Sequence, residues 1–364
     1  MAKQTLLERL KKNTTIKEAS LIKDSKIYGK SDVVSTNIPM LNVALSGELD
    51  GGLVSGLTQI AAPSKHFKSA FTLAIASAYQ KKYDDSIVLF YDSEFGTPES
   101  YFETLDVDMS RVFHSPITDI QILNEDIMAQ IDDVKRGDHL ITIVDSLGNL
   151  ASRKELDDVR AQKDVQDMSR AKKIKGLFRM VTPHLTIKDI PMIVINHTYK
   201  TQEMYSKDVV GGGTGSYYSS NTIWIIGRQQ EKETSGTEKG KLNGFTFIIN
   251  IEKSRFVKEK TKIPITVTFD GGIYRWSGLL DNALEGKFLV KTSDKTVQVC
   301  DPETGELSGD DLVIKKLEHD DAYFEALIKN EKFKEFIKNK YMIQSNLTGT
   351  PYILEDDEEE EDDE

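Results

Sequence analysis

The chain has 364 residues, of which 38% are hydrophobic and 29% charged, and this composition can bury one large core and a smaller second one. No apolar run approaches the roughly 18 residues that a membrane helix needs, and the N-terminal residues lack the apolar stretch of a signal peptide. Composition therefore excludes a membrane-spanning protein and favours a soluble intracellular one. Cys300 is the only cysteine, which excludes an intramolecular disulfide and argues against a cysteine-based metal site.

The net charge of −12 argues at first against a nucleic-acid partner, but its distribution is uneven. Residues 355–364 carry ten acids, which leaves a net charge of only −2 for the rest of the chain. A run of like charges cannot fold on itself, so we expect a disordered acidic tail. The charge of the rest of the chain leaves nucleic acid open as a partner.

The first 37 residues are polar and carry only a weak helical pattern of leucines, at Leu6, Leu7 and Leu10, which predicts an N-terminal arm (residues 1–37). Between residues 38 and 275, short strands rich in β-branched residues alternate with longer helical stretches. The strands are GLTQIAA, SIVLFYDSE, LITIVDSL, IPMIVINHT and TIWIIG. This alternation predicts an α/β fold, with βαβ units around a mostly parallel sheet that helices flank on both faces.

Two further segments, residues 244–255 and 262–272, resemble an antiparallel pair that closes one edge of this sheet. We expect a small, largely helical C-terminal domain to follow at residues 276–354, and then the acidic tail. The sequence contains no internal repeat.

Residues 61–69, AAPSKHFKS, end like the phosphate-binding loop G-x-x-x-x-G-K-[ST] but lack both of its glycines. Backbone amides wrap the phosphates in such a loop, and Ala62 can supply one in place of the first glycine. Phe67 can replace the second glycine only if its φ stays negative. Lys68 remains as a cation for the β- and γ-phosphates, and Ser69 as a hydroxyl for Mg²⁺. The candidate nucleotide-binding residues are Ala62, Pro63, Ser64, Lys65, His66, Phe67, Lys68 and Ser69.

Carboxylates follow two other predicted strands. Asp145 comes at the end of an apolar run, where a carboxylate at the edge of the sheet can hold Mg²⁺ through water. Asp92 and Glu94 end another strand, and their i, i+2 spacing predicts both carboxylates on one side, where one can orient a water against the γ-phosphate. Each signal has a structural alternative: a lysine in an ordinary strand-to-helix turn, a buried strand aspartate, or a salt bridge. Their coincidence in one α/β core favours nucleotide binding.

Residues 30–280 resemble the ATPase core of the RecA recombinase superfamily, and in particular its phage UvsX branch. The resemblance is carried by IPMLNVALSGELDGGLVSGLTQIAAPSKHFKS, FYDSEFG, VDSLGNLASRKE, INHTYKTQEMYSK, GGGTG and EKSRFVKEK. It implies a RecA-like P-loop ATPase core with ATP and Mg²⁺ as cofactors. In that case Glu94 activates the attacking water and Asp145 associates with Mg²⁺. Tyr101 then stacks on adenine, and His197 stands where the family has a polar sensor of the γ-phosphate, usually glutamine.

The resemblance also implies two DNA-binding loops. The first, residues 151–168, is mixed in charge, and its candidate residues are Arg153 and Lys154. The second, residues 198–215, interleaves cations with groups that can stack on bases. Its candidate residues are Tyr199, Lys200, Met204, Tyr205 and Lys207. By composition alone this loop would be an active-site lid, whereas the resemblance makes single-stranded DNA its ligand.

Lys253 and Arg255 alternate with Ser254 on a predicted strand, so both cations project to one face. By composition this face would only be a solvated surface. In the resemblance the pair reaches the γ-phosphate held by the neighbouring subunit, a role like that of an arginine finger supplied in trans. Hydrolysis then requires a helical filament, and we expect the N-terminal arm to dock onto the neighbour.

The resemblance thus implies a DNA-dependent, Mg²⁺-requiring ATPase that polymerises on single-stranded DNA and catalyses homologous pairing and strand exchange. Its expected partners are single-stranded and homologous duplex DNA, further copies of the chain, a single-strand-binding protein and a loading mediator, with no membrane. The expected location is the cytoplasm of an infected bacterial host. A hexameric helicase and a non-catalytic, ATP-gated mediator remain alternatives, and a small-molecule kinase is disfavoured. The acidic tail either competes with DNA for the basic loops, docks a basic partner or aids solubility.

Overall fold

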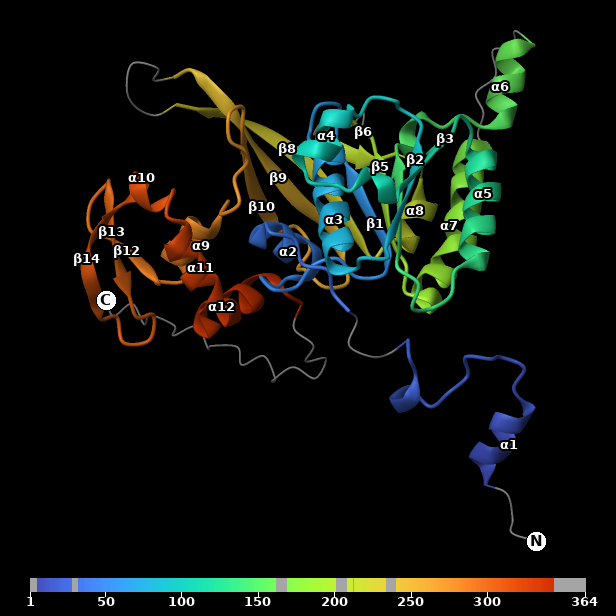
Figure 1. Cartoon of the computed structure of the whole chain (residues 1–364), viewed down its shortest axis with the longest axis horizontal. Coiled ribbons are helices and arrows are strands. Elements are labelled where there is room, and N and C mark those ends of the chain that lie inside the picture. The colour runs from blue at the N-terminus through green and yellow to red at the C-terminus, as the bar shows by residue number, and fades with distance from the viewer. Residues whose placement is uncertain are drawn as a thin grey trace, which may run out of the picture.

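The computed structural model of the protein describes residues 5–27, 32–161, 169–200, 208–211, 213–233 and 240–343. Its centre is a nine-stranded sheet in the order β11-β10-β9-β8-β1-β5-β4-β2-β3 (Figure 1). The pairs from β8 to β3 are parallel and the pairs from β8 to β11 antiparallel, so the predicted mostly parallel sheet with an antiparallel edge is confirmed. The strands are β1 Gly56–Ala61, β2 Ile87–Asp92, β3 Val112–Pro116, β4 Leu140–Asp145, β5 Pro191–Asn196, β8 Thr222–Lys232, β9 Leu242–Ser254, β10 Lys262–Thr268 and β11 Gly272–Ile273.

Helices cover both faces of the sheet, because the side chains of the parallel strands alternate between two buried cores. In β2, Val88 and Phe90 lie in one core, and Leu89 and Tyr91 lie in the other. Helices α2 and α3 pack in the first core, and α5 and α7 pack in the second (Figure 1). The helices of this part are α2 Pro39–Ser46, α3 Lys68–Lys82, α4 Glu99–Thr104, α5 Ile120–Asp133, α6 Arg153–Arg160, α7 Ser169–Lys188 and α8 Thr214–Ser219. No helix in the described residues is long and apolar enough to cross a membrane.

The C-terminal part differs from the largely helical segment that the sequence predicts, because it also contains a three-stranded antiparallel sheet. The sequence does not indicate these strands, since β14 is polar and mostly exposed and β12 has only three residues. The strands are β12 Leu289–Lys291, β13 Thr296–Cys300 and β14 Leu307–Val313, and the helices are α9 Leu279–Glu285, α10 Ile314–Leu317, α11 Asp321–Lys329 and α12 Glu331–Tyr341.

The C-terminal part shares its hydrophobic core with the large sheet. Trp276 is buried and its ring stacks on Phe324, with 5.6 Å between the ring centroids. The indole N–H of Trp276 donates to a carboxylate oxygen of Asp321 at 2.6 Å. Phe324 and Leu317 belong to the same buried cluster as side chains of β8, β9 and β10. The two parts are therefore expected to unfold together.

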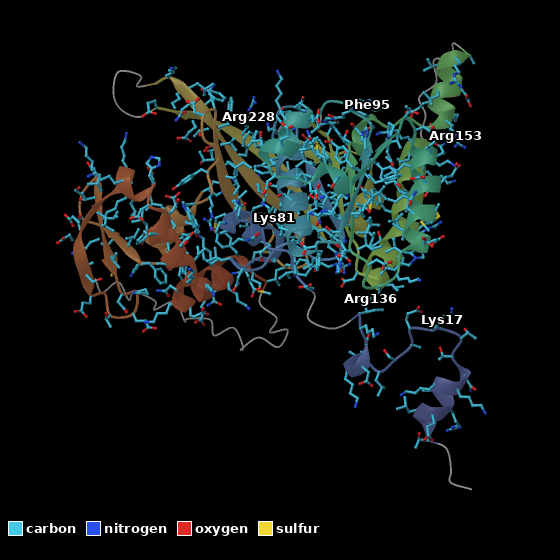
Figure 2. All side chains as sticks on the ribbon, in the orientation of Figure 1. Lys17, Lys81, Phe95, Arg136, Arg153 and Arg228 are labelled. Carbon is cyan, nitrogen blue, oxygen red and sulfur yellow. The ribbon has the colours of Figure 1, made fainter. Side chains whose placement is uncertain are left out.

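The N-terminal arm contains α1 (Leu6–Asn13), which a capping box between Thr5 and Glu8 stabilises. None of the residues of α1 is buried, and its leucines are 40% to 63% exposed. Nearer the core, the guanidinium of Arg136 donates to the backbone carbonyl of Lys26 at 2.8 Å. Figure 1 shows α1 standing away from the rest of the chain, and Figure 2 shows Arg136 at the end of the core that faces the arm. The apolar face of α1 is thus open for contact with another molecule.

The shared core leads to a testable expectation about stability. Leu317 is 3% exposed within the shared core, so Leu317→Ala should lower the free energy of unfolding by about 2 to 4 kcal/mol. Leu307→Ala is the matched control, since Leu307 is 46% exposed, and it should change that energy by less than about 0.5 kcal/mol. Urea unfolding followed by tryptophan fluorescence and by circular dichroism should show one shifted transition. Two separate transitions, only one of them shifted, would contradict the shared core.

Candidate active site

Four neighbouring parallel strands, β1, β5, β4 and β2, end at one edge of the sheet. Ala61 pairs with Asn196 across β1 and β5, and Asp92 pairs with Asp145 across β2 and β4. The chain therefore leaves these strands at the same level. The candidate residues that stand at this edge are Lys68 and Ser69 after β1, Glu94 after β2, Asp145 in β4 and His197 after β5.

The candidate phosphate loop, residues 62–67, joins β1 to α3, and two of its residues that are not glycine have positive φ. Lys65 has φ 60° and Phe67 has φ 61°, so the condition that the sequence set for Phe67 as a replacement of glycine, a negative φ, is not met. This conformation costs about 1 to 2 kcal/mol for each residue that carries a Cβ. The ring of Phe67 offsets part of this cost, because it stacks on Phe247 at 5.2 Å and meets Phe71 edge-on at 5.6 Å.

Lys68 is the first residue of α3, and its ammonium bends back over the loop. The ammonium donates to the backbone carbonyls of Ala62 (3.2 Å) and Pro63 (3.0 Å). Burial lowers the pKa of Lys68, and the nearby carboxylates of Glu94 and Asp145 partly oppose this. A cation held among loop carbonyls is suited to bind phosphate oxygens that enter the loop.

Ser69 and Asp145 are in direct contact at the edge of the sheet. The Ser69 hydroxyl donates to Oδ2 of Asp145 at 2.6 Å, while Oδ1 is buried with no hydrogen-bond partner among the described residues. Burial raises the pKa of Asp145 to about 6, helped by the carboxylates of Glu94 and Asp92 and opposed by Ser69 and Lys68. A hydroxyl beside a carboxylate with a free oxygen is a donor set that Mg²⁺ accepts together with phosphate oxygens and water. These residues therefore fit the metal that the resemblance implies.

Glu94 and His197 face each other across the edge of the sheet. Nε2 of His197 lies 2.8 Å from Oε1 of Glu94, and the hydroxyl of Ser146 donates to the same oxygen at 2.7 Å. Both side chains are about one third exposed, so water can reach them. Ser146 directly follows Asp145, which links the candidate base to the candidate metal ligand. The carboxylate is thus oriented by two partners, as a general base must be.

The carboxylate of Asp92 has different hydrogen-bond partners from that of Glu94. Strand β2 ends at Asp92, so the strand geometry that predicted both carboxylates on one side does not extend to Glu94. Oδ1 of Asp92 instead accepts hydrogen bonds from the backbone N–H groups of Glu94 (3.1 Å) and Phe95 (2.8 Å). The role of Asp92 is therefore to hold the turn that presents Glu94.

A groove of about 1110 Å³ runs beside the phosphate loop and along α3. Tyr101, in α4, is 41% exposed and lines this groove together with Phe67. The groove also involves residues that sequence reasoning missed, namely Gly271, Gly272 and Ile273 after β10. Only the DGG turn after a predicted strand could have signalled them. A planar base bound against Tyr101 would lie within reach of the loop.

The second candidate DNA loop forms a small hairpin whose base touches the candidate active site. Strands β6 (Thr198–Lys200) and β7 (Asp208–Val210) pair antiparallel, with Tyr199 opposite Val209. The backbone N–H of Gly211 donates to the carbonyl of His197 at 3.1 Å. Tyr199 and Lys200 are exposed, whereas the predicted residues Met204, Tyr205 and Lys207 lie outside the described residues. His197 therefore contacts the carboxylate of Glu94 and also directly precedes the first strand of the hairpin.

The first candidate DNA loop begins with α6, which a capping box between Ser152 and Glu155 starts. Arg153 is half-exposed and pairs with Glu125 (3.3 Å) and more distantly with Asp119 (3.7 Å). Lys154 is exposed beside it, and residues 162–168 lie outside the described residues. Figure 2 places Arg153 at the opposite end of the core from Arg228 of β8. Arg153 would have to exchange its carboxylate partners for phosphates on binding DNA.

Lys253 and Arg255 stand at the end of β9, close to each other. The ammonium of Lys253 donates to the carbonyls of Tyr217 (2.7 Å) and Tyr218 (3.3 Å) at the end of α8. Burial lowers the pKa of Lys253, and the positive charge of Arg255 lowers it further. Arg255 is exposed. Among the described residues, no hydrogen bond joins either cation to the phosphate loop of its own chain.

A parallel sheet with an antiparallel edge, a phosphate-type loop after β1 and a hairpin after β5 defines an α/β core of the RecA type. No family model matches the sequence. The chain is 46% identical over 341 residues to a "Recombination and repair protein" of Enterobacteria phage T4, covering 93% of this chain and 86% of that protein. It is 22% identical over 302 residues to a "Protein RecA" of Borreliella burgdorferi strain ZS7 (79% of this chain, 80% of that protein). To a "Protein RecA" of Borreliella afzelii it is 25% identical over 293 residues (79% and 77%). The chain belongs to the RecA superfamily, in its phage UvsX branch.

The raised pKa of Asp145 gives a pH prediction for the protein in EDTA. Because the pKa of about 6 in the folded state exceeds the unfolded value near 3.9, ionisation of Asp145 opposes folding. Ionisation of Asp145 therefore lowers the free energy of unfolding as pH rises from about 4 to 6, and above that range the loss no longer grows. Asp145→Asn should therefore be more stable than the parent at pH 7.5 by about 3 kcal/mol, with the gap closing near pH 4. Denaturant titrations at both pH values measure this difference.

Asp132→Asn is the control, since Asp132 is an exposed carboxylate on α5, and it should shift stability by less than about 0.5 kcal/mol at either pH. If Asp145→Asn is equally or less stable than the parent at pH 7.5, then ionisation of Asp145 does not lower the free energy of unfolding, and the prediction is wrong.

Proposed function

We propose that the protein is an ATP-dependent DNA recombinase, which forms filaments on single-stranded DNA and catalyses homologous pairing and strand exchange in recombination, repair and recombination-dependent replication. The observation that supports this most strongly is the position of His197. It touches the candidate base Glu94 and is followed at once by the exposed hairpin β6–β7. Chemistry on a nucleotide and contact with DNA would thus meet at one residue. The similarity to a phage recombination and repair protein supports the same function.

For ATP binding, the backbone N–H groups of residues 64–67 surround the β- and γ-phosphates. Ala62 does not supply the amide expected of it, because its N–H donates to the carbonyl of Asn196 at 3.3 Å, and Pro63 has no N–H. Lys68 exchanges its carbonyl partners for phosphate oxygens. Ser69 and Asp145 would hold Mg²⁺, the latter through water, and the ion would neutralise phosphate charge. The ion would also stabilise the ionised form of Asp145, which burial otherwise disfavours. Tyr101 stacks on adenine in the groove beside α3.

For hydrolysis, Glu94 accepts a proton from the water that attacks the γ-phosphorus, while the bond from this phosphorus to the β,γ-bridging oxygen breaks and ADP leaves. Ser146 and His197 orient its carboxylate. DNA bound to the β6–β7 hairpin would shift the backbone at Gly211, whose N–H donates a hydrogen bond to the carbonyl of His197. This shift would change the position in which His197 holds the carboxylate of Glu94. This gives a physical route for the dependence of hydrolysis on DNA.

We assign Lys253 and Arg255 to the active site of the neighbouring subunit in a filament, where they stabilise charge that develops on the γ-phosphate. The exposure of Arg255 and the lack of hydrogen bonds between this pair and its own phosphate loop, within the described residues, support that assignment. The exposed leucines of α1 support docking of the N-terminal arm onto a neighbour. We also propose a single-strand-binding protein and a loading mediator as partners, and the cytoplasm of an infected bacterial host as the location.

The proposed function is tested by joint formation between single-stranded DNA and a homologous duplex, with ATP and Mg²⁺. The wild-type chain should form joints only with homologous DNA. Lys68→Ala should lower the rate of ATP hydrolysis at least about a hundredfold and abolish joints, because the cation for the transferred phosphoryl group is lost. Lys329→Ala, an exposed lysine of α11, should leave the hydrolysis rate unchanged.

Unwinding of a tailed duplex without any homologous strand would instead identify a helicase. Joint formation that needs ATP but shows no hydrolysis would identify a non-catalytic, ATP-gated mediator. Normal hydrolysis by Lys68→Ala would contradict the phosphate-loop assignment.

The proposed shared site predicts complementation between two inactive variants. The double variant Lys253→Ala/Arg255→Ala lacks the trans cations, and Glu94→Gln lacks the base. Each should lose DNA-stimulated ATP hydrolysis alone while still binding ATP as dilute monomer. In a mixture, an interface that joins an intact Glu94 to intact cations of the next subunit is complete, so part of the hydrolysis should return.

Recovered hydrolysis should be greatest near equal amounts of the two variants. Co-assembly is checked by fluorescence energy transfer between labelled chains. Absence of recovery at every ratio, with mixed filaments present, would place the cations outside the active site.

A further inference from the structure

The phosphate loop is attached at two points to the middle of the hairpin formed by β8 and β9. This attachment was not visible in the sequence, because the hairpin lies far along the chain from the loop. It concerns the two loop residues with positive φ, Lys65 and Phe67, which occupy a conformation that glycine adopts most readily. The loop keeps that conformation without the glycines of the G-x-x-x-x-G-K-[ST] pattern.

The first attachment is aromatic. Phe67 stacks on Phe247 of β9, with 5.2 Å between the centroids and 26° between the ring planes. Phe71 of α3 closes the other side of the group, meeting Phe67 at 5.6 Å and Phe247 at 6.0 Å, both edge-on. Phe247 and Phe71 are fully buried, so the ring of Phe67 rests on a fixed part of the core.

The second attachment is polar and acts on the other strained residue. The guanidinium of Arg228 in β8 donates to the backbone carbonyl of Lys65 at 3.1 Å. The same guanidinium lies over the ring of Phe245, at 4.5 Å from its centroid, which limits its freedom. Phe245 in turn contacts Phe247, so both attachments rest on β9. Figure 2 shows Arg228 beside the β8–β9 hairpin.

We propose that these contacts form a loop clasp, in which Phe67 on Phe247 and Arg228 on the Lys65 carbonyl hold the phosphate loop in its phosphate-binding shape before nucleotide arrives. The proposal rests on the proposed function of residues 62–69 as an ATP site. Phe67 and Arg228 are positioning residues, since they act through the loop backbone whose amides bind the phosphates. A loop ordered in advance loses less conformational freedom on binding, which raises affinity.

The clasp reverses the usual expectation for this loop. If Phe67 were only a tolerated departure from glycine, Phe67→Gly would relieve the positive φ and leave binding unchanged or tighter. If the clasp orders the loop, the same change frees the loop and weakens binding. Because Phe67 also lines the groove beside Tyr101, it could instead act by touching the adenine base. Tripolyphosphate, which has no base, separates these two possibilities.

The experiment measures dissociation constants of Mg²⁺–ATP and Mg²⁺–tripolyphosphate by calorimetry, without DNA. Phe67→Gly should weaken both ligands by about tenfold, the effect expected from the loss of an aromatic stack in which Phe67 is partly buried. Phe67→Tyr keeps the stacked ring and should restore binding to within about twofold of the parent. Arg228→Gln should weaken both ligands by about threefold, since one hydrogen bond to the loop is lost. In steady state, Phe67→Gly should raise KM for ATP more than it lowers kcat.

Lys287→Gly is the matched control, because Lys287 is exposed, has φ 59° and lies in the C-terminal part. It should leave both dissociation constants unchanged. Circular dichroism checks that each variant is folded, and Arg228→Gln alters an exposed side chain, so it tests the clasp even where Phe67→Gly fails to fold.

Equal or tighter binding of both ligands by Phe67→Gly would overturn the clasp. A loss confined to ATP, with tripolyphosphate unaffected, would also overturn it and assign Phe67 to the base. Failure of the proposed function has a different signature: the parent and Lys68→Ala would then bind Mg²⁺–ATP equally, whatever the residue at position 67.

Discussion

The parallel pairing of β1, β5, β4 and β2 is the constraint on which the site depends. Backbone hydrogen bonds fix Asp92 opposite Asp145 and Ala61 opposite Asn196, so four chain segments emerge at one level. No side chain of the site has to create this arrangement. Each only has to lie in the segment that directly follows a strand, or, for Asp145, at the strand's last residue. A slip in register would move the alternating side chains of a strand to the wrong core, so the two buried clusters keep the site aligned.

The electrostatics of the site follow from this crowding. Lys68 and Asp145 are both buried, and burial weakens the charged form of each. Their opposite charges partly compensate, but the carboxylates of Glu94 and Asp92 add negative charge beside Asp145. Within the described part of the chain, Oδ1 of Asp145 has no hydrogen-bond partner, and this oxygen is where the compensation is incomplete. Such a site is improved by a ligand that brings phosphate to the lysine and a divalent cation to the acids.

Much of this arrangement could be predicted from the sequence, because it depends on signals local to a strand and the turn that follows it. The five central strands, the loop lysine and serine, and the carboxylates after two strands are of this kind. What could not be predicted depends on contacts between distant segments. The positive φ of Phe67 is sustained by Phe247, and the groove beside Tyr101 is completed by Gly271 and Gly272. The polar strand β14 pairs only because β13 offers it an edge. The turn at Glu94 was not predicted, because the alternation of side chains along a strand was applied as far as Glu94, whereas β2 ends at Asp92.

Because Phe67 stacks on Phe247, the residue that evolution can accept at either position depends on the residue at the other, although the two positions lie far apart in the chain. Loss of the Phe247 ring would leave the positive φ of Phe67 without its stacking partner, so a change at position 247 is unfavourable while Phe67 stays. Glycine at position 67 would also leave empty space beside β9, which some other side chain would have to fill. We therefore expect the two positions to change together among relatives, and a search that demands glycines in the loop would overlook those that retain the pair.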